Sequence, residues 1–497
     1  MKRLLARFGF FLLVVSWLVA LAALAQEPPR AYGALPTQRQ LDWHEMEMYG
    51  LIHFGLNTFQ DKEWGYGDAD PKLFSPTQFD AEQIVLAAKT GGLKGLILVA
   101  KHHDGFCLWP TKTTDYNITK SPWKNGQGDL VKEFQQACEK HGLRFGLYDS
   151  PWDRNNKDYG KPEYLTTYRA QLRELYSGYG ELFASWFDGA NGGDGYYGGA
   201  KETRKIDRTV YYDWDKTWLT ITRRMQPNAV IFSDIGPDIR WVGNEKGFAA
   251  ETHWATFAPV APDGKGKAAP GYVNEKELPG GHRDARQWLP AECDVPLRPG
   301  WFYHANQDDK VKTLEQMLDI YFKSVGRGAN LDWGLAPDQR GLLHENDVKA
   351  LAAFGAALQQ MFATNFAAGA AVTASNIRGE IDALYDPSRL LDDDRYSYWA
   401  TDDDVKTADV TFDLKQEKSF NVIRLRENIL IGQRVEGFAV DAWQNGAWQE
   451  ITSGTSIGAN RLVRLPASVK TTKVRLRITK SPVCVALSDF GLFAAPQ

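Results

Sequence analysis

The chain has 497 residues with a formal net charge of −4, and its 43% hydrophobic and 24% charged content is that of an ordinary folded protein. This length exceeds what one hydrophobic core usually serves, so we expect two or three domains. The acidic balance gives no electrostatic reason to bind nucleic acid or anionic lipid. Four cysteines without CxxC spacing indicate neither a zinc cluster nor a dense disulfide framework.

The chain begins with a segment typical of a secretory signal. Lys2, Arg3 and Arg7 precede a long apolar run that ends in small residues before Gln26. We expect a signal peptide over residues 1–25 and export to the periplasm or the extracellular space, with an uncleaved membrane anchor as the alternative. Cleavage leaves 55 Lys and Arg against 62 Asp and Glu, a net charge of −7, and no stable membrane span.

Four helix–strand units then follow one another. Residues 78–91 have apolar groups at helical spacing and precede the apolar run LKGLILVA, and the next helix begins near an aspartate and ends at Gly142. Near-continuous apolar strands between helices predict a parallel sheet buried on both faces. We also expect an early strand over 50–59 and late helices over 312–326 and 345–362.

Each of these four strands ends in polar residues. They are His102, His103 and Asp104, then Tyr148 and Asp149, then Trp186 and Asp188, then Ser233 and Asp234. The carboxyl ends of the strands of a (β/α)₈ barrel meet at one mouth, whereas a doubly wound sheet usually carries a glycine-rich phosphate loop, and none follows a strand here. The pattern predicts a catalytic (β/α)₈ barrel over residues 26–365.

The pattern changes after about residue 372. Short alternating segments such as DVTFDL, FNVIRLREN and EGFAVDAWQ are separated by turn residues without helices between them. This predicts an antiparallel β-sandwich over residues 372–497. The stretch DDDRYSYWAT (392–401) resembles discoidin-like, carbohydrate-binding sandwiches, and two interpretations stay open: the sandwich binds sugar, or these residues only pack it.

His102 and His103 are candidate binding residues. Adjacent residues in a strand point to opposite faces, so both can enter one site only if the strand has already ended. A metal site would need further ligands, and neither HxH nor HExxH occurs in the chain. Hydrogen bonding to vicinal hydroxyls is therefore favoured over metal binding, and the alternative is one core and one solvent-facing histidine.

Asp188 is the candidate catalytic carboxylate. It follows an apolar strand, precedes Gly189, and has Trp186 on the same strand face. A carboxylate beneath an aromatic wall suits attack on an anomeric carbon, whose transition state resembles an oxocarbenium ion. A purely structural carboxylate at a strand end is the alternative. The high content of 17 Trp and 20 Tyr fits either stacking on sugar rings or core packing.

Seven motifs occur in the order and at the spacings of the α-L-fucosidases, family 29 of the glycoside hydrolases, which residues 40–360 resemble. They are GLIHFGLNTF, EWGYGD, VAKHHDGFCLW, GLYDSPWD, WFDGA, GPDIRWVGNEKG and RPGWFYH. The resemblance implies a hydrolase that retains anomeric configuration, with Asp188 as nucleophile. The fucose contacts it implies are His53, Glu63, Trp64, His102, His103, Tyr148, Trp186 and, against the methyl-bearing face, Trp301.

The general acid/base differs between branches of this family. IRWVGNEKG is similar to the branch active on α-1,3 and α-1,4 fucosyl linkages, which implies Glu245. Glu251 and Glu292 are the rivals. An insertion between Asp188 and Glu245 lengthens a loop of the mouth. The effect of this longer loop on substrate specificity stays open.

The resemblance implies removal of terminal α-L-fucose from a fucosylated oligosaccharide or glycoconjugate by double displacement, without metal or organic cofactor. Two alternatives remain. One is a retaining exo-glycosidase for another sugar, and the other is a non-catalytic protein that binds fucosylated glycans.

Overall fold

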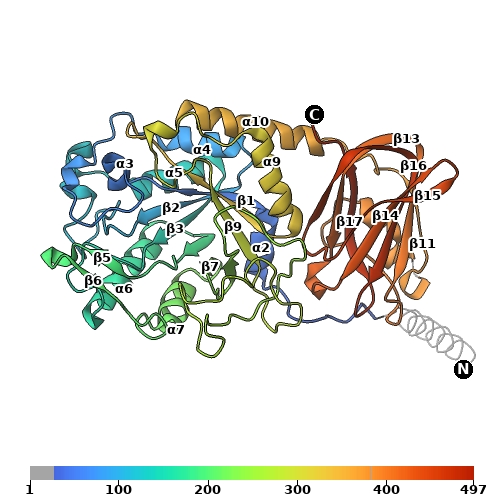
Figure 1. Cartoon of the computed structure of the whole chain (residues 1–497), viewed down its shortest axis with the longest axis horizontal. Helices are drawn as coiled ribbons and strands as arrows, with labels where there is room; N and C mark the ends of the chain where they lie inside the picture. The colour runs from blue at the N-terminus through green and yellow to red at the C-terminus, as the bar shows by residue number, and fades with distance from the viewer. Residues whose placement is uncertain (1–26, 381, 497) are drawn as a thin grey trace, which may run out of the picture.

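The computed structural model describes residues 27–380 and 382–496, and the predicted signal segment lies outside them. Eight parallel strands close into a barrel in the order β1-β10-β9-β8-β7-β4-β3-β2, which confirms the predicted barrel (Figure 1). These strands are β1 Met48–Ile52, β2 Gly95–Lys101, β3 Arg144–Asp149, β4 Ala184–Trp186, β7 Val230–Ser233, β8 Ile239–Trp241, β9 Ala291–Pro296 and β10 Asn330–Leu335.

Helices and short strands surround the barrel, and the sequence explains where several begin and end. The Asp129 side chain caps α5 by accepting from the Lys132 N–H, and Gly142 ends it with a left-handed φ of 72°. The helices are α2 Gln38–Met46, α3 Leu56–Gln60, α4 Ala81–Thr90, α5 Leu130–His141, α6 Pro162–Gly178, α7 Trp214–Thr217, α8 Arg223–Met225, α9 Leu314–Lys323 and α10 Glu345–Phe362, and the insertion adds β5 Gly193–Gly195 and β6 Glu202–Arg204.

The strand predicted over 50–59 is wrong in extent. β1 ends at Ile52, and the His53 N–H makes a last bond to the Leu335 carbonyl at 3.0 Å. The chain then turns at Gly55 into α3, where the Thr58 N–H bonds the Gly55 carbonyl. The pattern of apolar residues continues through both β1 and α3, so the sequence pattern did not reveal the turn at Gly55 between them.

The C-terminal region is an antiparallel β-sandwich, as predicted. Two of its strands contain 20 residues each, because segments predicted as separate strands run on through β-bulges between Asp413 and Lys418 and between Phe420 and Val422. The elements are β11 Ala371–Ala374, α11 Asp382–Tyr385, β12 Trp399–Ala400, β13 Ala408–Glu427, β14 Gly437–Gln444, β15 Ala447–Gly454, β16 Arg461–Lys480 and β17 Ala486–Phe493.

The sandwich packs beside α9 and α10 of the barrel domain (Figure 1). Charged side chains cross this interface: Glu47 Oε1 lies 3.0 Å from Arg395 Nη2 and 3.0 Å from Arg426 Nη2. Burial opposes ionisation of Glu47, but Arg426 and Arg395 lower its pKa below the usual value. Within the described residues, every helix falls short of the length and hydropathy that a membrane span needs.

Candidate active site

Asp188 lies at the carboxyl end of β4, held by two hydrogen bonds. Its Oδ2 accepts from the Tyr148 hydroxyl at 2.8 Å, and its Oδ1 accepts from the Ala190 N–H at 2.6 Å. Glycine at the next position leaves room for Asp234, because a Cβ at Gly189 would lie 2.4 Å from Asp234 Oδ2. The Asp188 side chain is 22% exposed, so an oriented carboxylate remains open to a substrate.

Both adjacent histidines reach this site because β2 ends at Lys101, just before them. The ring centroids of His102 and His103 lie 4.1 Å apart, and His103 Nε2 is 3.8 Å from Asp188 Oδ2. Burial lowers the pKa of each imidazole, so both are neutral near pH 7.

The hydrogen bonds assign opposite tautomers to the two rings. Ser150 Oγ donates to the Trp152 carbonyl and therefore accepts from His103 Nδ1 at 2.8 Å. Asn57 Nδ2 donates to His102 Nδ1 at 3.3 Å. His102 therefore carries its proton on Nε2, whereas His103 keeps a free lone pair on Nε2. One donor beside one acceptor matches a pair of neighbouring hydroxyl groups.

Aromatic rings form the floor of the site. Trp186 stacks on Tyr148 with centroids 5.0 Å apart and on Phe232 at 4.2 Å. Its indole N–H donates to Glu292 Oε1 inside the barrel at 2.8 Å. The ring is therefore fixed in orientation by contacts on two sides and by a buried hydrogen bond.

The remaining predicted aromatic residues lie on the walls. Trp301 packs against His53 with centroids 5.1 Å apart and over the backbone of β10, where a Cβ on Gly334 would lie 2.6 Å from the indole. Burial lowers the pKa of His53 to about 3. Trp64 meets His103 edge-on at 5.2 Å and is 52% exposed. An exposed tryptophan at a polar mouth provides an apolar surface for a sugar ring.

Glu63 joins the two sides of the site that carry Trp64 and Trp301, because it precedes Trp64 in the chain and its side chain bonds the loop of Trp301. Its carboxylate accepts from the N–H groups of Trp301 at 2.9 Å and Phe302 at 3.2 Å, and from His304 Nε2 at 2.7 Å. Glu63 therefore holds the loop that carries Trp301, besides being a predicted fucose contact.

Glu245 lines the same cavity of about 240 Å³ as Asp188. Loss of water raises the pKa of Glu245, the negative charges of Asp188 and Glu63 raise it further, and a hydrogen bond with the Trp301 side chain opposes them. A carboxyl group with a raised pKa holds a proton that it can donate near neutral pH.

The two rival glutamates lie elsewhere. Glu292 is fully buried inside the barrel, where it accepts from Trp186 and from the Tyr49 hydroxyl, and burial raises its pKa to about 7. Glu251 faces the sandwich, where it pairs with Arg461 and, at 2.7 Å, with Arg327 Nη2. Of the three candidates, only Glu245 shares a cavity with Asp188.

Comparisons with known proteins agree with this geometry. A family model described as Alpha-L-fucosidase matches residues 30–361, and an F5/8 type C domain model matches residues 371–488. This chain belongs to the α-L-fucosidase family. It is therefore a glycoside hydrolase that releases fucose.

Relatives extend the family match over nearly the whole chain. Alpha-L-fucosidase 1 of Arabidopsis thaliana is 39% identical over 98% of this chain and 92% of its own length. A structure titled as a putative alpha-L-fucosidase from Bacteroides thetaiotaomicron is 37% identical with a TM-score of 0.83, covering 94% of this chain and 99% of that one. A glycoside hydrolase 29 fucosidase of Ruminococcus gnavus in complex with fucose is 30% identical with a TM-score of 0.84, covering 95% and 97%.

Sequence reasoning missed Trp241, Asp294 and Arg208, which line the cavity of this fucosidase, and named Asp234 only as a polar residue at a strand end. The indole N–H of Trp241 donates to Asp294 Oδ1 at 2.6 Å. Asp234 Oδ2 accepts from the backbone N–H of Gly271 at 2.6 Å. Arg208 returns from the insertion to bond the Gly271 carbonyl. Position at the end of β8 could have identified Trp241, and alternation with Glu292 could have placed Asp294 on the inner face of β9.

Among residues 27–380 and 382–496, no group of three or more His, Cys, Asp or Glu side chains is arranged to hold a metal ion. All four cysteines are unpaired and buried.

Proposed function

We propose that the protein hydrolyses terminal α-1,3- and α-1,4-linked L-fucose with retention of anomeric configuration. The observation that carries this proposal is the single cavity shared by Asp188, oriented by two hydrogen bonds, and Glu245, whose pKa is raised. Retention requires one ionised and one protonated carboxyl group about 5–5.5 Å apart across the scissile bond.

In the first step Asp188 attacks C1 of fucose and Glu245 gives its proton to the departing glycosidic oxygen. The C1–O bond to the glycan breaks, and a fucosyl ester of Asp188 forms. Tyr148 donates to Asp188 Oδ2, so its hydroxyl helps to hold the attacking carboxylate in place. In the second step Glu245 takes a proton from water, the water oxygen attacks C1, and Asp188 leaves with the bonding electrons.

Recognition of fucose rests on the histidine pair and the aromatic walls. His102 Nε2–H donates to one hydroxyl and His103 Nε2 accepts from its neighbour, so a sugar lacking that pair binds less well. Trp301 lies beside His53 and packs against the apolar face that carries the methyl group. These contacts favour fucose over a sugar with a hydroxymethyl group at that position.

A fluorinated fucoside that traps the covalent ester tests the mechanism. Peptide mapping by mass spectrometry is expected to find the label on Asp188. Label on another residue, or an inverted product seen by NMR at the first turnover, would contradict the proposal.

A substrate panel tests the linkage, which is supported by the similarity of IRWVGNEKG to one branch of the family. Lewis-type trisaccharides are expected to release fucose, whereas a 2-fucosyl-lactose type substrate is cleaved slowly or not at all. Cleavage confined to the 2-linked substrate would overturn the linkage assignment and leave the fucosidase activity standing.

We also propose export, with cleavage before Gln26. The support is the three basic residues and apolar run at the start of the chain. N-terminal sequencing of the protein recovered from the periplasm or the medium is expected to begin at Gln26, and an intact N-terminus in the cytoplasm would contradict export.

A further inference from the structure

Glu245 lies in the first turn of the long β8–β9 loop, residues 242–290. The Asn244 side chain closes that turn, because its Oδ1 accepts from the Lys246 N–H at 3.1 Å and its Nδ2 donates to the Phe248 carbonyl at 2.9 Å. The turn is therefore a small closed unit. Where it places the Glu245 carboxyl group depends on what fixes the loop on either side of it.

The barrel fixes this loop through backbone groups. Arg240 on β8 is fully buried, and its guanidinium donates to the carbonyls of Leu278 and Trp254, each at 3.1 Å. The Ala249 N–H donates to the Lys323 carbonyl at the end of α9, at 2.9 Å. These bonds join the loop to β8 before the turn and to α9 after it.

The sandwich holds the same loop from outside the barrel, through Gln433. This residue lies between β13 and β14 and is only 6% exposed. Its Oε1 accepts from the Ala255 N–H, and its Nε2 donates to the His253 carbonyl, both at 2.9 Å. The residue between them is Trp254, whose carbonyl accepts from Arg240. One amide of the sandwich and one guanidinium of the barrel thus bond three consecutive loop residues.

Two further buried side chains of the sandwich extend this contact. Ser456 Oγ accepts from the His253 N–H at 2.9 Å. Asn460 Nδ2 donates at 3.2 Å to the Val325 carbonyl, just beyond the end of α9. The Glu251 side chain is 62% exposed, so its ion pairs contribute little to this contact. The buried hydrogen bonds to backbone groups therefore do most to hold the loop.

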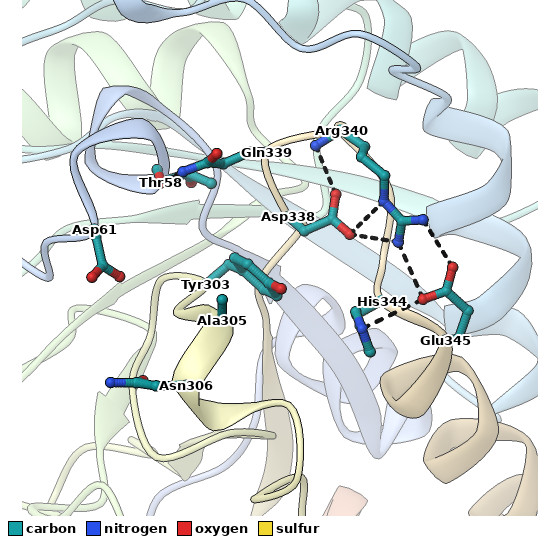
Figure 2. A pocket seen from close by; sticks show the side chains of 10 residues that line it. All are labelled: Thr58, Asp61, Tyr303, Ala305, Asn306, Asp338, Gln339, Arg340, His344 and Glu345. Atoms are coloured by element: carbon teal, nitrogen blue, oxygen red, sulfur yellow. Dashed lines mark hydrogen bonds and ion pairs between the residues drawn. The ribbon is translucent and has the colours of Figure 1, made fainter.

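The loop after β10 is held in a different way. Figure 2 shows Arg340 of this loop between Asp338 and Glu345, which begins α10. The Arg340 guanidinium donates to Asp338 Oδ2 at 2.7 Å and to Glu345 Oε1 at 2.9 Å. Side chains of the barrel domain itself thus hold that loop, whereas the loop of Glu245 receives hydrogen bonds from a second domain.

We propose that the sandwich positions the general acid of the barrel, with Gln433 as the positioning residue. This inference rests on the proposed function, since it takes Glu245 as the acid/base. Proton transfer requires the acid within about 2.6–3.2 Å of the departing oxygen, so a small displacement of the turn slows the step that needs the proton. The bonds that orient Asp188 come from Tyr148 and Ala190, outside the β8–β9 loop. Loss of the contact therefore impairs the acid more than the nucleophile.

The test compares two fucosides that need the proton to different extents. The leaving group of a chloronitrophenyl fucoside departs with little protonation, whereas that of a phenyl fucoside depends on it. Gln433→Met keeps the size of the side chain and removes both hydrogen bonds. We expect kcat/KM to fall about tenfold on the phenyl fucoside and less than about twofold on the chloronitrophenyl fucoside. The ratio of the two values removes any change in the amount of active protein.

Gln444→Met is the matched control, because Gln444 on β14 bonds the Lys470 carbonyl inside the sandwich at 3.3 Å. It is expected to leave both kcat/KM values unchanged. Ser456→Ala removes one bond to the β8–β9 loop and is expected to lower the ratio about threefold. Equal losses on the two fucosides in Gln433→Met, or an unchanged ratio, would overturn the proposal. If Gln433→Met does not fold, the ratio in Ser456→Ala decides in the same way.

Hydrogen–deuterium exchange follows the loop itself. Peptides covering residues 243–256 are expected to exchange faster in Gln433→Met than in the wild type, while peptides from β1 to β4 stay unchanged. Faster exchange throughout the barrel would indicate a general loss of structure and contradict a positioning role. Failure of the proposed function gives a different result, because the wild type would then cleave neither fucoside, or Glu245→Gln would cleave the phenyl fucoside at the wild-type rate.

Discussion

The carboxyl groups of the barrel mouth and those of the barrel–sandwich interface have opposite surroundings. At the mouth, Glu245 and Asp234 have raised pKa values because burial removes water and Asp188 adds negative charge. At the interface, arginines lower the pKa of Glu47 and pair with Glu251. At the mouth the pKa values of Glu245 and Asp234 thus stay raised, although Arg208 opposes the rise at Asp234, whereas the carboxyl groups that join the domains pair with arginines.

The largest effect is expected at Asp188, where replacement by Asn removes the nucleophile. We expect kcat/KM to fall by about 10⁴-fold while the circular dichroism spectrum stays unchanged. Asp234→Asn is the matched control, because Asp234 lines the same cavity, and it should cost no more than about tenfold. Equal losses in the two variants would count against a nucleophile at position 188.

The same substitution at two glutamates compares the two regions directly. Glu245→Gln should lower kcat on a poor leaving group by about 10²–10⁴-fold, because no proton is donated, and azide should restore part of the rate on an activated fucoside. Glu251→Gln should leave kcat nearly unchanged, because that side chain faces the sandwich. The reverse order of effects would assign the proton donor to Glu251.

Replacing a carboxyl group should lower the stability of the protein at the barrel–sandwich interface and not at the barrel mouth. Glu47→Gln leaves Arg395 and Arg426 without their shared partner, and we expect a loss of about 3 kcal/mol in the free energy of unfolding. Urea denaturation followed by tryptophan fluorescence measures it. Glu251→Gln, in a more exposed pair, should cost at most about 1 kcal/mol, and equal costs would refute the distinction.

The smallest effect is on the pH profile. The charge of Glu63 raises the pKa of Glu245, so Glu63→Gln should lower that pKa. Because the general acid works only when protonated, the alkaline limb of kcat/KM should move to lower pH, by less than about one unit. Glu251→Gln serves as the control with an unmoved limb, and a shift to higher pH in Glu63→Gln would contradict the electrostatic account.

The barrel, the sandwich and a carboxylate after β4 could be predicted from the sequence, because apolar periodicity and strand-end residues are local signals. The apolar pattern alone could not choose among three glutamates, and the preference for Glu245 came only from the resemblance of IRWVGNEKG to one branch of the family. Glu245, Glu251 and Glu292 all follow or lie within apolar segments, and only the fold shows that one lines the mouth, one faces the sandwich and one lies inside the barrel. The turn at Gly55 was missed because the apolar pattern continues through it.

Glu292, enclosed below Trp186, has a consequence for the pH at which the barrel is stable. Its pKa rises from 4.5 to about 7, so between these values folding takes up a proton that the unfolded chain releases. The stabilisation is complete below the ordinary pKa and is lost as the pH rises through the folded-state value. Through Glu292, mildly acidic pH therefore stabilises the folded barrel, and alkaline pH lowers its stability because a charge then lies in the barrel interior.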